Sequence, residues 1–318
     1  MNLLIIGGTG FFGKAILTFL LNNKSDIQTI TIVGRSAESF KKIYPHYCDI
    51  ENIHFCSIDI LKNLNDLGSE YTHIIHAAAD SSNVTHLTYL DRYNQIVNGT
   101  IAVLEYIKNN CPEAKLLFVS SGGVYGQMPQ NINSFKEDHP LTHNLLDPTK
   151  VYSIAKIAAE NLCAIYNEMY GLKLSIVRCF SFSGFHLPLD VHFAIGNFIK
   201  NAISSEDITI QGNGLSDRSY LDQNDLAEWI LTICKKDSFN RTLYNIGSDQ
   251  KINIASLANM VSKISNKDIK VKILNQNRKE LRQSRYIPDV SKIKDTFGLG
   301  IKVPLEESIK NMIKHNQK

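Results

Sequence analysis

Short apolar runs recur along the first 180 residues, with segments of helical spacing between several of them. Continuous runs of this length are typical of strands buried in a parallel sheet. We expect strands at residues 2–6, 29–33, 55–60, 72–76, 115–119 and 174–178. Residues 14–21, 94–108 and 149–170 carry apolar positions at helical spacing and predict helices. Strands and helices in alternation predict a doubly wound α/β fold, whose ligands bind beyond the carboxyl ends of the strands.

Three glycines follow the first strand at intervals of three residues: Gly7, Gly10 and Gly13. A glycine-rich turn between a strand and a helix lets backbone amides approach a pyrophosphate at the helix N-terminus. An isolated glycine triplet is usually only a loop, but its place directly after the first strand predicts dinucleotide binding. The residues expected to contribute are Gly7, Thr9, Gly10, Phe11, Phe12 and Gly13.

The residues after the second strand bear on which dinucleotide binds. An acidic residue there accepts the ribose hydroxyls of NAD, whereas an arginine suits the 2′-phosphate of NADP. This chain has Gly34-Arg35-Ser36 and no acid before Glu38. The guanidinium of Arg35 and the hydroxyl of Ser36 therefore favour NADP(H) over NAD(H). The alternative is a solvated arginine in a turn.

Further cofactor contacts are expected near the ends of the third and fourth strands. Asp59 could accept a hydrogen bond from the adenine amino group, or it could equally well cap a helix. Small residues after the fourth strand would let the backbone approach a flat ligand. His76 is expected to be packed at the strand end rather than to act as a ligand or base. The candidates here are Asp59, Ile60, Ala77, Ala78, Ala79 and Asn98.

A tyrosine and a lysine stand four residues apart in Lys150-Val151-Tyr152-Ser153-Ile154-Ala155-Lys156. On a helix these two positions share a face, so Tyr152 and Lys156 point the same way. A neighbouring ammonium lowers the pKa of a tyrosine from its ordinary value of about 10, which lets the phenol exchange protons near neutral pH. Alone, such a pair is more often two surface residues. The glycine loop and Ser121 support a catalytic role for this pair, because both follow strands whose ends can share one crevice.

Composition narrows the class of protein. The chain has 318 residues, of which 43% are hydrophobic and 20% charged, and its formal net charge is +3. This balance is typical of globular proteins and argues against a nucleic-acid or membrane surface. The longest apolar runs are strand-sized, so no transmembrane helix is expected. Six cysteines without a C-x-x-C pair, and a start directly on a strand, predict a cytoplasmic protein without a metal or disulfide framework.

The glycine loop, Ser121, Tyr152 and Lys156 together resemble the extended short-chain dehydrogenase/reductase family of nucleotide-sugar epimerases, dehydratases and reductases. The resemblance spans nearly the whole chain and includes Ser120-Ser121-Gly122-Gly123-Val124-Tyr125-Gly126 and Arg218-Ser219-Tyr220-Leu221-Asp222. It implies that Tyr152 is the general acid/base, that Lys156 bonds the nicotinamide ribose, and that Ser121 bonds the reacting oxygen.

The resemblance also implies a nucleoside-diphosphate sugar as substrate, with arginines on its phosphates. A cationic group on a diphosphate is what charge-assisted hydrogen bonding favours. Many members have an asparagine where this chain has Ser181, so the loop around the nucleotide sugar is expected to differ from theirs. The substrate candidates are Ser121, Gly122, Tyr152, Ser181, Asn197, Arg218, Arg278 and Arg282.

Gly122 and Gly123 stand where the family's 4,6-dehydratases have an acidic pair, and glycine can transfer no proton. Dehydration is therefore not expected. The preferred reaction is reduction of a 4-keto-6-deoxy sugar nucleotide, with 4-epimerisation on a tightly bound NAD as the alternative. The third hypothesis is a sensor that binds NADP and catalyses no reaction, although such relatives typically lack the tyrosine or the lysine.

By the same resemblance, the chain should divide into two parts. Residues 1–179 and about 221–252 are expected to form the dinucleotide-binding Rossmann domain, and about 180–220 with 253–318 a smaller C-terminal substrate lobe. The predicted helices at 94–108 and 149–170 resemble those that pair relatives into dimers, so a homodimer is expected.

Overall fold

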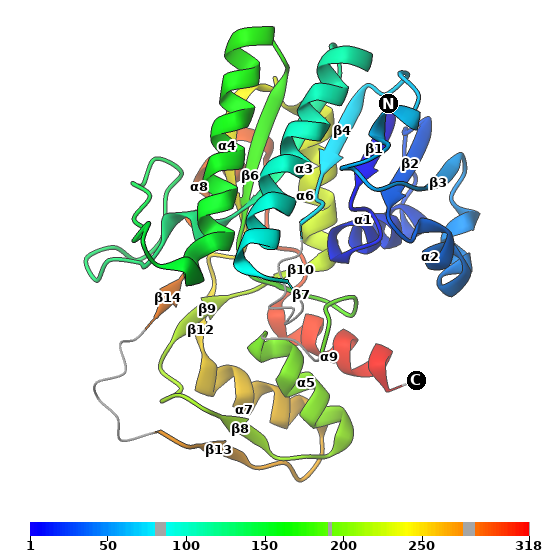
Figure 1. Cartoon of the computed structure of the whole chain (residues 1–318). Coiled ribbons are helices and arrows are strands. Elements are labelled where there is room, and N and C mark those ends of the chain that lie inside the picture. The colour runs from blue at the N-terminus through cyan, green and yellow to red at the C-terminus, as the bar shows by residue number, and fades with distance from the viewer. Residues whose placement is uncertain (80–86, 190–192, 276–283, 318) are drawn as a thin grey trace. The chain divides into compact units, whose positions relative to one another are not determined.

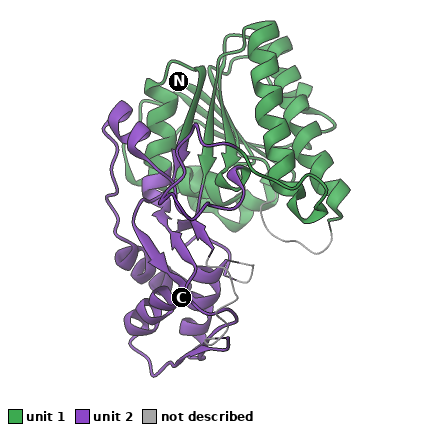
Figure 2. Ribbon diagram, turned by 90° about the vertical axis from the view of Figure 1, so that its left-hand side faces the viewer, with its two compact units in different colours: residues 1–124, 141–179, 227–244 green, residues 125–140, 180–226, 245–318 purple. Residues whose placement is uncertain are grey.

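The computed structural model describes residues 1–79, 87–189, 193–275 and 284–317. The chain divides into two compact units made of interleaved segments (Figure 2). Unit 1 comprises residues 1–124, 141–179 and 227–244. Unit 2 comprises residues 125–140, 180–226 and 245–318.

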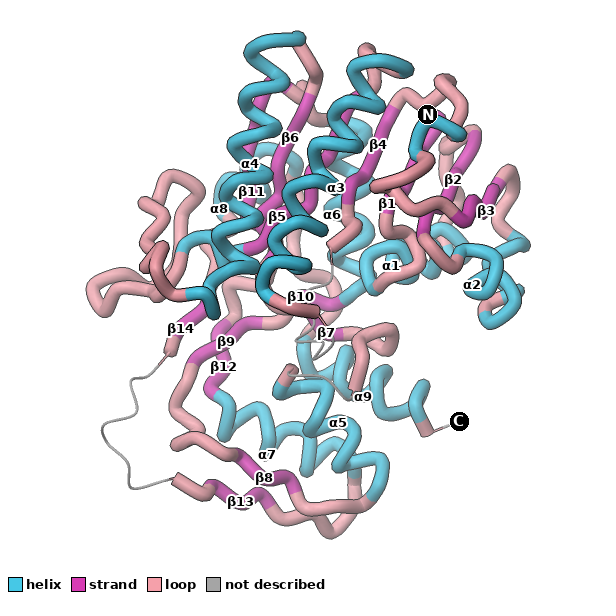
Figure 3. Tube along the Cα trace, viewed as in Figure 1, coloured by secondary structure: helices cyan, strands magenta, loops and turns pink. Residues whose placement is uncertain are grey.

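A seven-stranded sheet lies at the centre of unit 1, in the order β11-β6-β5-β4-β1-β2-β3 (Figure 3). The strands are β1 (Asn2–Ile6), β2 (Thr29–Gly34), β3 (Ile53–Ser57), β4 (His73–His76), β5 (Lys115–Ser121), β6 (Leu174–Cys179) and β11 (Asn240–Ile246). Strand β1 pairs in parallel with β2 on one side and β4 on the other, so the strand order reverses there. Such a reversal is where open parallel sheets bind their ligands.

Helices cover both faces of this sheet. They are α1 (Phe11–Asn22), α2 (Ala37–Ile43), α3 (Tyr89–Asn110), α4 (Val151–Tyr170) and α6 (Gln223–Lys236). Helices α3 and α4 pack side by side over one face (Figure 1). Lys235 of α6 forms an ion pair with Asp26, which follows α1. No helix of the described residues has both the length and the apolar character needed to cross a bilayer.

The sequence accounts for these elements locally. The four apolar residues at 3–6 are fully buried in β1, as expected of a strand covered on both faces. Helix α3 begins with a capping box in which Thr88 and Asp91 bond each other's backbone amides. Helix α4 ends at Gly171, whose φ of +69° is the left-handed conformation that favours glycine.

Unit 2 is built from short elements. Its helices are α5 (Ala194–Ser204), α7 (Ile254–Ser265), α8 (Ser291–Phe297) and α9 (Leu305–Asn316). Its strands are β7 (Phe182–Ser183), β8 (Ile208–Ile210), β9 (Asp217–Ser219), β10 (Leu221–Asp222), β12 (Lys251–Asn253), β13 (Val271–Ile273) and β14 (Arg285–Tyr286). Strand β9 pairs with β12 and β14, β8 with β13, and β7 with β10. Helices α5, α7 and α9 pack together through buried apolar residues such as Ile199, Val261 and Met312.

The third strand differs from its prediction. It spans Ile53–Ser57 rather than residues 55–60, so Asp59 and Ile60 lie beyond it. A turn ends the strand, because the carbonyl of Asp59 accepts the amide of Lys62 at 2.9 Å. The seven-residue helices α2 and α8 were not predicted, since elements this short carry little periodic signal.

Candidate active site

The glycine loop leads from β1 into α1 at the carboxyl edge of the sheet. The amides of Gly7 and Gly8 donate to the carbonyl of Val33 in β2, at 2.8 and 3.2 Å. Gly7 has a φ of +85°, and a Cβ there would lie 2.6 Å from the amide nitrogen of Ala78. Only glycine lets the loop pass the end of β4 this closely.

Glycine is also required where α1 begins. A Cβ on Gly13 would lie 1.8 Å from the carbonyl oxygen of Gly8, so the first turn of α1 packs directly on the loop. This contact brings the helix N-terminus, with its partial positive charge, to the sheet edge where a diphosphate can bind. The cofactor candidates of the segment lie in the loop or the first turn of α1: Gly7, Thr9, Gly10, Phe11, Phe12 and Gly13.

Arg35 and Ser36 are exposed directly beyond β2. Ser36 precedes α2, but its hydroxyl does not cap that helix. The amide of Glu38 donates to the Ser57 hydroxyl at 3.1 Å, which ties the start of α2 to the end of β3. A cationic and a hydroxyl side chain therefore stand at the end of the second strand.

The candidates after β3 and on α3 have local roles in the structure. Oδ1 of Asp59 accepts the amide of Leu61 at 3.1 Å, so this oxygen caps a turn, and an adenine contact stays a prediction. Ile60 packs on α3, with its Cδ1 2.9 Å from where a Cβ on Gly99 would lie. Asn98 is exposed on α3.

The three alanines after β4 continue beside β1. The amide of Ala77 donates to the carbonyl of Ile6 at 2.9 Å, and the amide of Ala79 donates to the carbonyl of Ala77 at 3.0 Å. All three residues, 77–79, are half-buried. Because Gly7 lies against Ala78, the backbones of the alanine segment and the glycine loop pack directly on each other.

Lys156 is buried on α4, with 4% of its surface exposed. Its Nζ donates to the carbonyl of Val119 in β5 at 2.7 Å and lies 4.8 Å from the ring centre of Phe118. Burial lowers the pKa of Lys156 to about 8, while charge interactions with Cys179, Glu160 and Cys163 act in the opposite sense. The lysine is therefore mostly an ammonium at neutral pH. Tyr152 lies one helical turn earlier, half-buried against the hydrophobic core under α3 and α4.

Ser121 is the last residue of β5, and its Oγ accepts the amide of Gly123 at 3.1 Å. A Cβ on Gly123 would lie 3.2 Å from this oxygen and 3.0 Å from Oγ of Ser153, the residue after Tyr152. The end of β5 and the first turn of α4 therefore meet around Gly123. We call Ser121, Gly123, Tyr152, Ser153 and Lys156 the Gly123 corner.

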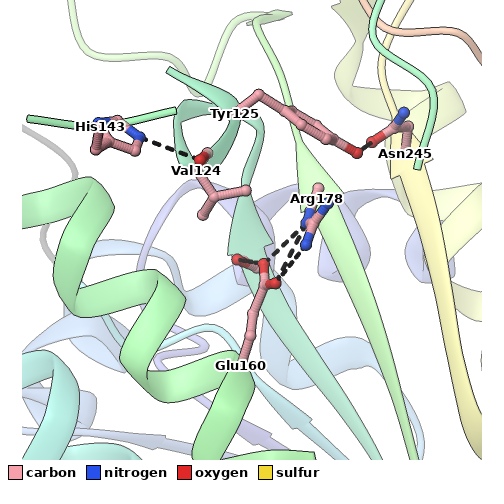
Figure 4. A network of polar contacts seen from close by, with 7 residues as sticks. Val124, Tyr125, His143, Glu160, Arg178 and Asn245 are labelled. Carbon is pink, nitrogen blue, oxygen red and sulfur yellow. Dashed lines mark hydrogen bonds and ion pairs between the residues drawn. The ribbon is translucent and has the colours of Figure 1, made fainter. Parts of the chain in front are cut away.

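His143 holds the turn after Ser121 and was not predicted as a site residue. Its Nε2 donates to the carbonyl of Gly123 at 3.0 Å. It also donates to the carbonyl of Val124 at 3.1 Å (Figure 4). Both partners are acceptors, so Nε2 carries the proton. A histidine outside any motif gives no sequence signal for this contact.

His76, at the end of β4, is packed as predicted, with 3% of its surface exposed. Its ring centre lies 5.6 Å from that of Phe118, and its Nδ1 has no hydrogen-bond partner among the described residues. Burial, and then the charge of Lys156, lower the pKa of His76 to about 3. The imidazole is therefore neutral.

Gly122 follows Ser121 in unit 1, and the other substrate candidates beyond the Gly123 corner belong to unit 2. Arg218 lies on β9, and its Nη1 donates to the carbonyls of Asp217 and Ser284 at 2.8 and 3.1 Å. Ser181 and Asn197 are half-buried, the latter on α5. Arg278 and Arg282 lie outside the described residues. Contact of these residues with a sugar nucleotide stays a prediction.

A second buried polar group beside the corner was also missed. Glu160 of α4 bonds both Ser120 of β5 and Arg178 of β6. A signal was present, because Arg178 is a charged residue inside an otherwise buried strand and Glu160 follows Lys156 by four residues. Within the described residues, no three His, Cys, Asp or Glu side chains gather so as to hold a metal.

Comparison with known proteins gives a family match over most of the chain. The model of the "NAD dependent epimerase/dehydratase family" matches residues 3–247. UDP-glucuronic acid decarboxylase 6 of Arabidopsis thaliana is 26% identical over 317 residues, covering 97% of this chain and 87% of that protein. UDP-glucuronic acid decarboxylase 1 of Xenopus tropicalis is 24% identical over 323 residues, covering 100% and 72%.

Solved structures share the fold. UDP-glucuronic acid 4-epimerase from Bacillus cereus, in complex with UDP-glucuronic acid and NAD, superposes with a TM-score of 0.83 at 22% identity, covering 99% of this chain and 98% of that chain. UDP-glucose 4-epimerase from Thermotoga maritima, with UDP-glucose, gives 0.82 at 22% identity, with the same coverage of 99% and 98%. The predicted doubly wound Rossmann architecture is thereby confirmed.

Proposed function

Because the chain belongs to the NAD dependent epimerase/dehydratase family, we propose that it is an oxidoreductase of nucleoside-diphosphate sugars. In the proposed reaction, a hydride passes between a nicotinamide dinucleotide at the glycine loop and carbon 4 of the sugar. The observation that carries the proposal is the Gly123 corner. There the first turn of α4, which carries Tyr152 and Ser153, meets the strand end that carries Ser121, and the buried Lys156 lies one turn further along the helix.

Each member of the corner has a proposed task. Tyr152 carries the proton that the oxygen on carbon 4 gains or loses, and Ser121 holds that oxygen by a hydrogen bond. An ammonium has three N–H donors, and Val119 takes one from Lys156, so the others can hold the cofactor ribose. The charge of Lys156 also favours the ionised phenol. The bound nicotinamide supplies the hydride chemistry, while the protein supplies position and the proton.

Two reactions at carbon 4 have specific support. Reduction of a 4-keto-6-deoxy sugar nucleotide is supported by Arg35 and Ser36, because a reductase consumes a soluble nicotinamide, commonly NADPH. Epimerisation at carbon 4 is supported by the 4-epimerase in complex with NAD that shares the fold. Dehydration is disfavoured, because Gly122 and Gly123 carry no acid and a Cβ on Gly123 would already lie 3.0 Å from Ser153 Oγ.

A panel of sugar nucleotides distinguishes these reactions. The protein is mixed with NADPH or NADH and a 4-keto-6-deoxy sugar nucleotide, and separately with UDP-glucose and UDP-glucuronic acid. Loss of absorbance at the nicotinamide band establishes the reductase, and interconversion of two sugars without added cofactor establishes the epimerase. Release of carbon dioxide from UDP-glucuronic acid would place the chain with the decarboxylases. Tight cofactor binding without any conversion would instead favour a cofactor sensor.

Tyr152→Phe tests the central role at the site. We expect turnover to fall at least about a hundredfold, because a positioned general acid/base contributes this much or more. Cofactor affinity, measured by fluorescence titration, should stay within about threefold, since in the proposed site the hydroxyl acts on the substrate oxygen. Tyr170→Phe, at the exposed end of the same helix, is the matched control. Activity retained in Tyr152→Phe would remove Tyr152 from its role.

We further propose that the exposed Arg35 and Ser36 select NADP(H). A charge-assisted bond to the 2′-phosphate predicts that Arg35→Ala weakens NADP⁺ binding about 10-fold to 100-fold and leaves NAD⁺ binding unchanged. Lys42→Ala, an exposed lysine of α2, is the control. Tighter binding of NAD⁺ than NADP⁺ by the unaltered protein would instead align it with the NAD-bound relative.

We propose that the substrate lobe comprises about 180–220 and 253–318, which carry the candidates Ser181, Asn197, Arg218, Arg278 and Arg282. Arg218 is supported by geometry, because two backbone carbonyls fix its guanidinium on β9. A guanidinium held in this way is suited to the diphosphate. Loss of substrate affinity in Arg218→Gln, with unchanged cofactor affinity, would support this assignment.

A homodimer through α3 and α4 is proposed on the exposed apolar side chains of α4. Ile165 and Met169 are 40% and 64% exposed and share one helical face, being four residues apart. Exposed apolar pairs of this kind favour a partner surface.

Six free cysteines, four of them buried, support a reducing compartment such as the cytoplasm.

A further inference from the structure

Glu160 joins three elements directly beside the Gly123 corner (Figure 4). Its Oε2 lies 2.7 Å from Nη2 of Arg178, and its Oε1 lies 3.1 Å from Nε of the same guanidinium. Oε1 also accepts the hydroxyl of Ser120 at 2.5 Å. One carboxylate on α4 is therefore bonded to β5 and β6 at once.

The partners of this carboxylate are themselves aligned. Ser120 and Arg178 are register partners in the parallel pairing of β5 with β6. Lys156 and Glu160 are four residues apart on α4, and they bond the consecutive residues Val119 and Ser120 of β5. The next residue of β5 is Ser121. Two successive turns of the helix thus fix the strand immediately before the serine.

Stability alone is a weak reason for this arrangement. Glu160 and Arg178 are 9% and 6% exposed, and a buried ion pair gains little over apolar residues of similar size because desolvation costs so much. Such pairs are better explained by the geometry they impose. Here the Glu160–Arg178 pair, with Ser120, fixes the position of α4 along β5.

We propose that Glu160 is a positioning residue for the catalytic lysine and serine, an inference that rests on the proposed function. It fixes the first half of α4 against the ends of β5 and β6. The distance between Ser121 and Lys156 is thereby held constant. Its negative charge also supports the ammonium of Lys156 against burial. Glu160 itself touches neither cofactor nor substrate.

The charged and titratable groups around Lys156 come from the strands β4 and β6 and from α4 itself. Glu160 and Cys163 raise the pKa of Lys156 from its own helix, and Cys179 raises it from β6. His76 faces it from β4 and is neutral. Arg178 on β6 is paired with Glu160. Glu160 is the carboxylate among these groups, so Glu160→Gln removes a negative charge that raises the pKa of the lysine.

Ser120→Ala and Glu160→Gln test the proposal by kinetics. Ser120→Ala keeps the buried ion pair and removes one bond, so kcat should fall about fivefold to tenfold while KM stays within twofold. Glu160→Gln should lower kcat about a hundredfold, as small misplacements of catalytic groups do. Glu168→Gln, an exposed glutamate of the same helix, is the matched control. A folded Ser120→Ala and a folded Glu160→Gln that both keep kcat within twofold would overturn the proposal.

A second readout requires no turnover. Lysine labelled with ¹⁵N gives a signal for Lys156, assigned by its loss in Lys156→Met and titrated in the intact protein. The pKa of Lys156 should be lower in Glu160→Gln than in the unaltered protein, and unchanged in Glu168→Gln. An unchanged titration in a folded Glu160→Gln contradicts the proposal. If no sugar nucleotide is converted, the proposed function fails while this titration still decides the link between Glu160 and Lys156.

Discussion

Lys156 of α4 and His76 at the end of β4 are two buried basic side chains, and they differ in charge at neutral pH. The pKa of the lysine is about 8, so it is mostly charged at neutral pH. The pKa of the histidine is about 3, because burial and the nearby ammonium both disfavour the imidazolium. Of these two residues, only Lys156 carries a charge at neutral pH. The Val119 carbonyl and the face of Phe118 stabilise that charge on Lys156.

This difference predicts acid sensitivity that His76 controls. The unfolded chain binds a proton on His76 below pH 6.5 and the folded chain does so only near pH 3, so stability is full above pH 6.5 and falls as the pH is lowered. The loss between pH 6.5 and 4.5 should be about 2–3 kcal/mol for this group. His76→Leu should flatten the profile of unfolding free energy, measured by urea denaturation at each pH.

His54→Leu, at an exposed histidine of β3, is the control for His76→Leu and should leave the slope unchanged. His73 contributes in the same direction, because burial lowers its pKa to about 4, so some acid sensitivity should remain. A slope equal to that of the unaltered protein in His76→Leu would contradict the charge states described for the two residues.

Among the elements, α1 and α4 are each positioned on the sheet by contacts in their N-terminal halves. Helix α1 packs on the glycine loop through Gly13 and Gly8, without room for a side chain. Helix α4 is joined to β5 by Lys156 and Glu160 through hydrogen bonds. Both helices thus bring their N-terminal ends to the ligand edge of the sheet, one by close backbone packing and the other by polar contacts.

Gly13→Ala tests the backbone packing of α1. Its Cβ would lie 1.8 Å from the carbonyl oxygen of Gly8, so backbone must move and the free energy of unfolding should fall by about 3 kcal/mol or more. Gly10→Ala is the matched control, because its Cβ would lie 3.4 Å from the nearest atom, the carbonyl oxygen of Gly7. It should cost less than about 1 kcal/mol. Equal losses in the two variants, measured by urea denaturation, would show that the loop can move away from α1.

The whole molecule consists of two units, and the chain passes from one unit to the other several times. Unit 1 carries the glycine loop and the Gly123 corner, and unit 2 carries Arg218 on β9. Neither unit is one continuous segment, because 125–140 belongs to unit 2 and 227–244 to unit 1. Each unit therefore needs distant parts of the chain to complete its core. We therefore expect that deleting any one of these segments lowers the stability of the unit to which it belongs.

The proposed homodimer is tested at this scale. Replacing Ile165 and Met169 by lysine should convert the dimer to a monomer, since it puts two charges on the proposed apolar face of α4. Leu274→Lys is the matched control, because Leu274 is 58% exposed in unit 2. Light scattering after size-exclusion chromatography measures the mass. A monomeric unaltered protein, or a doubly substituted protein that stays dimeric, would exclude this surface.

Much of the fold and the family followed from local sequence patterns. The buried run at 3–6, the glycine spacing and the i, i+4 pair of Tyr152 and Lys156 each depend on residues close together in the chain. Hydrophobic periodicity therefore sufficed for the long elements of unit 1. The third strand and the short helices α2 and α8 were misplaced or missed, since backbone bonds to distant residues decide such boundaries.

By itself the sequence determined the doubly wound architecture, the glycine loop after the first strand and the residues proposed for proton transfer, because these depend on spacing along one strand or helix. Only the tertiary structure decided which polar groups meet across elements. It placed Glu160 between Ser120 and Arg178, His143 on the turn after Ser121, and an uncharged His76 near Lys156. These contacts join residues far apart in the chain, and burial sets their charges, so spacing along the chain could not reveal them.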